Sequence, residues 1–205
     1  MDLLSDYKSK REKENSFQVK IESYISRGIK IFGKNAIFFI FYTIIYLACL
    51  SVPVIGFIIS MPLVAGFYLS AHYLESGKTL HFEDMFDGFK HFAGLFLFAI
   101  VSAFFIILGL IALIIPGIYL LVGYIFTPFF IVFEKMDFWE AMERSRKLVH
   151  KEWLSFFVFL IVLFLFNILG LLALGIGVLL TIPISFCAIY AAFDDIVGLD
   201  KIENY

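Results

Sequence analysis

Charged side chains are scarce in this chain and are missing altogether from three long stretches. Only 17% of the residues are charged, against about 25% in an ordinary soluble domain. Residues 35–74, 91–133 and 153–193 contain no Asp, Glu, Lys or Arg. With 61% hydrophobic residues, the chain has too little polar surface to cover a core in water. This composition excludes an ordinary soluble domain and favours a chain solvated by lipid.

The sequence also has few of the groups from which catalytic centres are built. The two cysteines, Cys49 and Cys187, fall in charge-free stretches and are interpreted as small packing residues. The four histidines share no short metal-ligand spacing, and the sequence has no Ser/His/Asp set, phosphate loop or nucleic-acid motif. We therefore expect no enzyme, no cofactor and no nucleic-acid partner. Without charge inside the spans, an ion-coupled pump is not expected either.

Each charge-free stretch is about twice as long as one membrane span, which takes about 20 apolar residues. Glycine or proline interrupts each stretch near its middle, where it allows the chain to turn back. The sequence therefore predicts six membrane helices in three hairpins. The first and fourth helices are short, so some helices are expected to stop shy of the far interface or to tilt little. The approximate spans are 35–51, 55–74, 92–115, 117–133, 153–174 and 177–193.

Positive charge defines an orientation. All 16 Lys and Arg residues lie outside the three charge-free stretches, and the hairpin tips carry none. Since positive side chains stay on the cytoplasmic side, we expect both termini and both long loops in the cytoplasm. The predicted organisation is a polar cytoplasmic tail (1–20), a six-helix membrane domain (21–195) and a second cytoplasmic tail (196–205).

The membrane domain contains a threefold repeat of about 60 residues, with approximate units 21–78, 79–136 and 137–195. Each unit has an amphipathic segment followed by two spans, so all units enter the membrane the same way up. A pseudo-threefold axis along the membrane normal is therefore expected. Three sets of residues recur: one residue ahead of each hairpin (Gly28, Gly88, Lys147), one turn glycine (Gly56, Gly117, Gly177) and one proline in each second helix (Pro62, Pro128, Pro183).

The predicted fold class is an all-α membrane bundle in which each hairpin follows an interfacial amphipathic helix. The three interfacial helices would form a cytoplasmic collar. Acidic residues end the second helices, where the helix dipole disfavours anions. Pairing with basic residues of the collar would resolve this conflict, and so would exposure to water. A metal site is the third and least favoured explanation. The acidic residues are Glu75, Glu134, Asp194 and Asp195.

The basic residues that flank the hairpins are the candidate contacts for anionic lipid headgroups. A cation near the membrane surface contributes about 1 kcal/mol to such binding. The same charges would also appear merely to orient the chain, and this interpretation stands beside the first. The set comprises Arg27, Lys30, Lys34, Arg144, Arg146, Lys147 and Lys151.

Asn167 is the most polar residue deep in a predicted span. It could contact a substrate, but we favour a hydrogen bond between helices, worth ~0.6–2 kcal/mol. Two interpretations of Pro62, Pro128 and Pro183 stay open. They kink the second helices around a central cavity, or they stand in first turns, where proline is tolerated.

Three segments together resemble a broad group of bacterial six-helix membrane proteins of unknown function. They are Ile-Pro-Gly-Ile-Tyr at 115–119, Phe-Trp-Glu-Ala-Met-Glu-Arg-Ser at 138–145, and the glycines and proline of 175–183. The group includes the membrane domain of certain glycerophosphodiester phosphodiesterases and Bacteroidetes proteins labelled beta-carotene monooxygenase. The resemblance covers about residues 20–195 and implies the bacterial inner membrane. Neither enzyme activity is expected, because a catalytic barrel and a histidine-rich iron site are both missing.

Two functions from different classes follow. The first is a non-catalytic membrane component that binds anionic lipid, a second copy of the chain or another membrane protein through its collar. The second is a transporter or channel for a small neutral or amphipathic solute. A polar stripe facing the bundle axis would favour transport, whereas a dry axis packed with Phe and Leu would argue against it.

Overall fold

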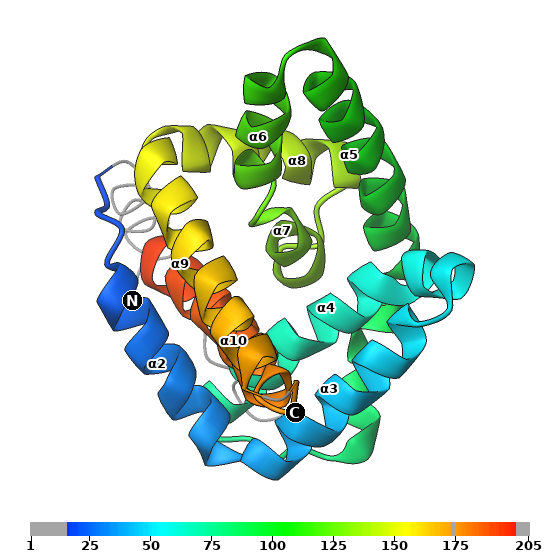
Figure 1. Cartoon of the computed structure of the whole chain (residues 1–205), viewed down its shortest axis with the longest axis vertical. Helices are drawn as coiled ribbons and strands as arrows, with labels where there is room; N and C mark the ends of the chain where they lie inside the picture. Colours follow the sequence, from blue (N-terminus) through cyan, green and yellow to red (C-terminus); the bar gives the residue numbers. More distant parts are fainter. Residues whose placement is uncertain (1–15, 174, 200–205) are drawn as a thin grey trace, which may run out of the picture.

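The computed structural model describes residues 16–173 and 175–199, in which the chain forms helices and no strand (Figure 1). Most of the two predicted tails therefore lies outside the described residues. The α-helices, together with the 3₁₀ helix η1, are α2 (Ile21–Lys34), α3 (Ala36–Leu50), α4 (Pro53–Glu75), η1 (Phe82–His91), α5 (Phe92–Ala112), α6 (Ile114–Gly123), α7 (Thr127–Phe133), α8 (Phe138–His150), α9 (Trp153–Leu172) and α10 (Val178–Val197).

Five helical segments are long and apolar enough to cross a membrane: α4, η1 with α5, α6 with α7, α9 and α10. A sixth results if α2 and α3 are counted together, although these two helices are bent by 98° at Asn35. By length and composition, the chain is thus a multi-pass, all-helical membrane protein. The segment expected ahead of the second hairpin is a 3₁₀ helix.

The turns of the hairpins are tight, and glycine is needed at each of them. A Cβ atom on Gly56 would lie 2.9 Å from the Cα of Leu50, and one on Gly177 would lie 2.5 Å from the carbonyl oxygen of Gly170. Gly117 is held in the same way against the backbone of Leu110. Any side chain at these positions would force the two helices of the hairpin apart. The second turn itself is at Leu113, slightly ahead of the predicted Pro-Gly pair.

The three second-helix prolines do not occupy equivalent places. Pro62 and Pro183 stand inside α4 and α10. Pro128 is in the first turn of α7, because the predicted span 117–133 is broken between Gly123 and Thr127. Residues Ile114–Phe133 still form one apolar segment long enough to span a membrane, but its helix is interrupted there. The first-turn interpretation holds for Pro128 and fails for the other two.

Aromatic side chains from α4, α7 and α10 fill the centre of the molecule. Phe129 stacks between Tyr68 and Phe193, with ring centroids 4.0 Å and 4.5 Å away. Phe67, Phe126, Phe130, Phe156 and Phe159 are also fully buried. In Figure 1, α7 lies at the centre of the ribbon with α4 and α10 beside it. Helices α5 and α9 are peripheral. Only 22% of the most apolar 18-residue stretch is buried in each of them, compared with 72% in α10.

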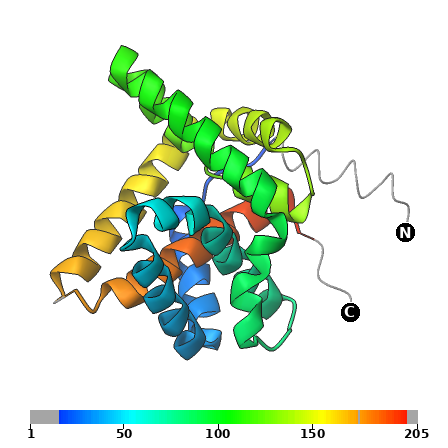
Figure 2. The ribbon, with the colours of Figure 1, turned by 90° about the vertical axis from the view of Figure 1, so that its right-hand side faces the viewer.

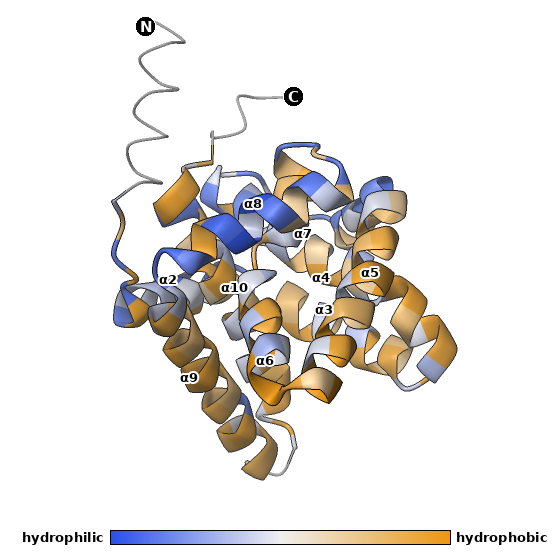
Figure 3. Cartoon of the chain, turned by 90° about the horizontal axis from the view of Figure 1, so that it is seen from above, coloured by the Kyte–Doolittle hydropathy of each residue, from blue (hydrophilic) through white to orange (hydrophobic). Residues whose placement is uncertain are grey.

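Polar and apolar residues are separated along one direction of the molecule. Hydrophilic ribbon gathers on one side, over α8 and the start of α2, while α5, α6 and α9 extend away from it and are hydrophobic (Figure 3). Figure 2, turned by 90° from Figure 1, shows α5 inclined across the molecule. Hydrophilic residues are thus concentrated on the side that carries α8.

Candidate functional site

Each segment that precedes a hairpin packs on the second helix of another hairpin. The helix α2 packs along α10, η1 packs along α4, and α8 packs on α6 and α7. Glycine permits the first two contacts. A Cβ atom on Gly28 would lie 2.9 Å from the carbonyl oxygen of Ile184, and one on Gly88 would overlap the carbonyl oxygen of Pro62. The backbones thus approach as closely as small residues allow.

At the third contact, α8 presents a serine. The hydroxyl of Ser145 donates a hydrogen bond to the carbonyl oxygen of Gly123 (2.7 Å) and accepts one from the backbone N–H of Phe126 (3.1 Å). These backbone groups lie where α6 gives way to α7. Ser145 is fully buried, so it satisfies polar groups that would otherwise be costly to bury.

The acidic ends of the second helices are paired with basic residues of α2 and α8, as the first of the explanations considered above expects. The Nη2 atom of Arg27 lies 2.6 Å from a carboxylate oxygen of Glu75 and 2.5 Å from one of Asp194. The Nζ atom of Lys34 lies 3.0 Å from the other oxygen of Glu75. We call these four residues the clasp, since they join α2, α4 and α10.

Arg144 makes the corresponding link at α7 and α8. It is ion-paired with Glu134 at the end of α7, and its guanidinium lies 4.5 Å from the ring centroid of Phe130. Lys20 and Asp195 form a further, looser pair at 3.5 Å. Three of the seven candidate lipid contacts, Arg27, Lys34 and Arg144, therefore hold helices together.

Of the remaining candidates, Lys30, Lys147 and Lys151 are exposed and Arg146 is half-buried. Lys30 lies on α2 and Lys151 just after α8. Arg146 and Lys147 both pair with Glu143 within α8, at 3.0 Å each. Since all three charges belong to one helix, these pairs do not connect helices. The helix begins at Asp137, whose carboxylate accepts a hydrogen bond from the N–H of Trp139.

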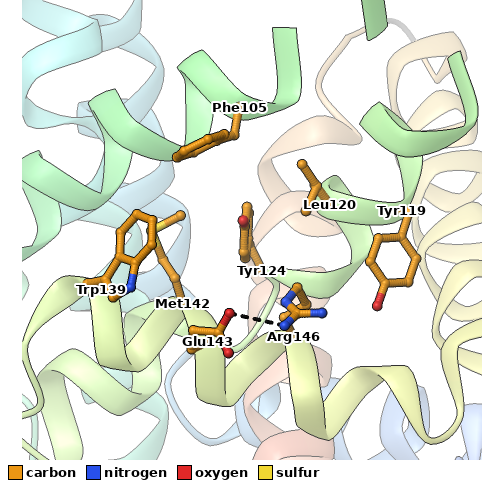
Figure 4. A pocket seen from close by; sticks show the side chains of 8 residues that line it. All are labelled: Phe105, Tyr119, Leu120, Tyr124, Trp139, Met142, Glu143 and Arg146. Atoms are coloured by element: carbon orange, nitrogen blue, oxygen red, sulfur yellow. Dashed lines mark hydrogen bonds and ion pairs between the residues drawn. The ribbon is translucent and has the colours of Figure 1, made fainter. Parts of the chain in front are cut away.

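A cavity of about 300 Å³ lies beside this face of α8, between α5 and α6 (Figure 4). Aromatic and aliphatic side chains form most of its wall, and the Glu143–Arg146 pair lies at its polar side. An amphipathic molecule could place an apolar chain against the first group and a charged group against the second. The lining residues are Phe105, Tyr119, Leu120, Tyr124, Trp139, Met142, Glu143 and Arg146.

Neighbouring side chains shift the pKa values of the two charged groups at the cavity, Glu143 and Arg146. Hydrogen bonds from Lys147 and Arg146 lower the pKa of Glu143. Hydrogen bonds with Glu143 and with Tyr119 raise the pKa of Arg146 above its ordinary value. Around neutral pH, the cavity therefore presents a permanent guanidinium cation, and the neighbouring carboxylate is ionised.

Tyr119 fixes the end of the cavity that borders α9. Its hydroxyl lies 3.0 Å from Nδ1 of His150, and its carbonyl oxygen accepts a hydrogen bond from Nε1 of Trp153 at 3.3 Å. On the opposite wall, the rings of Phe105 and Trp139 meet edge-on at 6.1 Å. Tyr119 and Trp139 lie in the segments that carry the resemblance to bacterial six-helix proteins, but none of these aromatic residues was predicted to line a binding site. Clustered Tyr and Trp beside basic residues, which are typical of a membrane interface, were the available signal.

Asn167 makes the contact between helices that we favoured. Its side-chain Nδ2 donates to the hydroxyl of Ser185 on α10 and to the carbonyl oxygen of Leu163, at 2.8 Å each. Ser185 in turn donates to the carbonyl oxygen of Thr181. The chain of hydrogen bonds runs between α9 and α10, so Asn167 belongs to the packing of the third hairpin.

Within residues 16–173 and 175–199, no group of three or more His, Cys, Asp or Glu side chains could hold a metal ion. Comparison with known proteins adds no assignment, because no family model, curated protein or solved structure matches this chain. The resemblance to bacterial six-helix proteins accordingly stays a prediction.

Proposed function

We propose that this protein is a non-catalytic membrane component that binds an anionic phospholipid at the cavity between α5, α6 and α8. The observation that carries the proposal is the position of Arg146, a half-buried guanidinium at the edge of an aromatic cavity. A phosphate can accept two parallel hydrogen bonds from such a group, and an acyl chain can lie against the aromatic wall.

The neighbours of Arg146 suit the exchange of partners that binding would require. Glu143 and Lys147 are solvent-exposed, with side-chain exposures of 39% and 71%. Exposed ion pairs within one helix stabilise it by about 0.3–0.5 kcal/mol. A phosphate in the cavity would therefore displace Glu143 at little cost and gain the attraction of both cations, about 1 kcal/mol for each.

The lipid site belongs to a bundle that we propose to be a parallel threefold repeat of hairpins, each opened by an interfacial segment. Two facts support this. The contacts of Gly28, Gly88 and Ser145 fall on carbonyl groups of α10, α4 and α6, about 61 residues apart from one another. The residue before each contact also bonds a side chain near the end of the second helix concerned. Arg27 bonds Asp194 of α10, and Asp87 accepts a hydrogen bond from Tyr73 of α4. Arg144 bonds Glu134 just after α7, the helix that completes the second span of the middle unit. On this proposal, the counterpart of Gly88 is Ser145 and not Lys147.

The orientation that we propose has α8 and both ends of the described chain on the cytoplasmic side of the inner membrane. The positive charge of α8 and the polar side seen in Figure 3 support it. Binding of a second copy or of another membrane protein at the collar is an alternative that the experiment below separates. Transport is not proposed, because aromatic side chains fill the centre where a polar stripe would be needed.

Native mass spectrometry of the protein in vesicles of mixed phosphatidylglycerol and phosphatidylcholine tests the lipid proposal. We expect the wild type to retain phosphatidylglycerol and the Arg146→Gln/Lys147→Gln variant to lose it. Lys90→Gln/Lys78→Gln, which removes two exposed charges that do not line the cavity, should behave as wild type. Equal retention by all variants would refute the site. Loss of lipid on addition of inorganic phosphate would assign it to the free anion, and a dimer without lipid would favour the protein partner.

A further inference from the structure

The second hairpin, α5 with α6, is attached near its turn to the polar side of the molecule. Tyr119 bonds His150, the last residue of α8, and Trp153, the first residue of α9. Lys151 and Glu152 lie between these two partners. Because α8 and this junction carry charges, they lie at the membrane surface, and Tyr119 lies close to the same level.

The distance from this attachment to the turn is short. Leu113 precedes Tyr119 by six residues, which span about 9 Å of α-helix. The hydrocarbon core of a bilayer is about 30 Å thick. A helix attached at Tyr119 therefore cannot place its turn at the opposite surface.

The helix α5 is long enough to cross, but its middle does not lie at the middle of a membrane. Its 21 residues span about 31 Å. Two thirds of the way along, Phe105 contacts Trp139 of α8 and shares the cavity with Glu143 and Arg146. The helix thus passes close under the charged helix α8, and it is inclined in Figure 2. In Figure 3, α9 extends further from the polar side than α6 does.

The turn itself is suited to hydrocarbon. Ile111, Leu113 and Ile115 are 78%, 70% and 78% exposed, and residues 103–118 contain no polar side chain. The N–H of Leu113 donates to the carbonyl oxygen of Gly109 at 3.1 Å, so the turn pairs its own backbone. A turn at the far interface would be expected to carry polar or aromatic anchors.

We infer that the second hairpin is re-entrant: it enters the membrane from the side of α8 and returns to that side without crossing. The lipid that surrounds its apolar tip is the hydrocarbon of the near leaflet and of the bilayer centre. The hairpin forms the membrane-side wall of the cavity, so an acyl chain could reach the cavity by passing along it. The inference rests on the position of Tyr119 and stands whether or not the cavity binds lipid.

Cysteine labelling in oriented membrane vesicles tests this inference. The background is Cys49→Ala/Cys187→Ala, with Leu113→Cys as the probe and Lys78→Cys, which is exposed in the loop after α4, as the accessible control. We expect an impermeant maleimide to label Lys78→Cys from one side and Leu113→Cys from neither side until detergent is added. Labelling of Leu113→Cys from the side opposite to Lys78→Cys would overturn the inference.

A cysteine that reacts slowly could be mistaken for one that is embedded, so the depth of Leu113→Cys in the bilayer is measured separately. A bimane on Leu113→Cys should be quenched more strongly by lipids with a nitroxide on the acyl chain than by lipids with a nitroxide on the headgroup. Stronger quenching from the headgroup would place the turn at an interface and contradict the hairpin's embedded tip. Failure of lipid retention with unchanged labelling would refute the proposed function alone.

Discussion

The clasp and the outer face of α8 are built from the same residue types and serve different ends. In the clasp, Arg27 is paired with carboxylates from two other helices, Glu75 and Asp194, whose side chains are 24% and 19% exposed. On α8, Arg146 and Lys147 share Glu143, which belongs to the same helix and is 39% exposed. The comparison teaches that a basic residue beside a membrane span holds the fold when its acid comes from another helix. When its acid is local, as for Arg146, the cation can exchange that acid for the anionic lipid that we propose.

The largest expected effect comes from separating α2 from α10. In Gly28→Leu, the new side chain meets the backbone of Ile184 and Ala188, so we expect a loss of about 3 kcal/mol, typical of overpacking. Gly33→Leu is the matched control, because a Cβ atom there has no neighbour within 4 Å. Thermal unfolding in detergent measures the difference. Similar stability of the two variants would show that α2 does not hold α10.

Breaking the clasp electrostatically should cost somewhat less. Arg27→Met leaves Glu75 and Asp194 without their shared cation, and we expect a loss of about 1–2 kcal/mol, reduced from the value for a fully buried pair because solvent screens these groups. The double variant Arg27→Met/Asp194→Asn should recover part of the loss. If Arg27→Met lowered the free energy of unfolding no more than Lys90→Gln does, the clasp would not contribute to stability.

The same kind of change on α8 should spare stability. For Arg146→Gln we expect a loss of at most about 0.5 kcal/mol, since the pair with Glu143 is exposed and lies within one helix. Its lipid retention should nevertheless fall. If Arg146→Gln destabilised the protein as much as Arg27→Met, the distinction between the two regions would collapse.

The smallest effect concerns pH. The pKa of Glu143 is lowered in the folded protein by Lys147 and Arg146, so its stabilising contribution is present above the ordinary glutamate range. It is lost as the pH falls through the lowered pKa. The stability difference between wild type and Glu143→Gln should therefore be seen at neutral pH and vanish in acid. A difference independent of pH would rule out this ion pair as its source.

The membrane segments could be predicted from the sequence because hydrocarbon excludes charge over lengths that are easy to count. Lys34 and Glu75 bound the first stretch, and they are indeed ion-paired at one end of the first hairpin. Asn167 was predictable for a similar reason, since a lone amide inside a span needs a partner. The pairing of terminal acids with basic residues followed from the conflict between those acids and the helix dipole.

Other features depend on contacts between residues far apart in the chain. Nothing local to Gly28 indicates that it faces Ile184, and nothing local to Pro128 indicates that Ser145 supports a broken helix beside it. The cavity could not be predicted from the sequence because its lining residues come from three helices and recur at no regular sequence separation. The shallow position inferred for the second hairpin rests on the hydrogen bonds of Tyr119 with His150 and Trp153, which a hydropathy profile does not reveal.

The central claim is that the cations of α8 bind anionic lipid whereas those of the clasp hold the fold. Thermal unfolding in nanodiscs, with phosphatidylglycerol replacing phosphatidylcholine stepwise, tests it most directly for wild type, Arg146→Gln and Arg27→Met. Since a ligand of the folded state raises Tm, we predict that phosphatidylglycerol raises Tm for wild type and for Arg27→Met, despite the lower starting Tm of the latter, and leaves Arg146→Gln unchanged. An equal rise for Arg146→Gln would contradict the account.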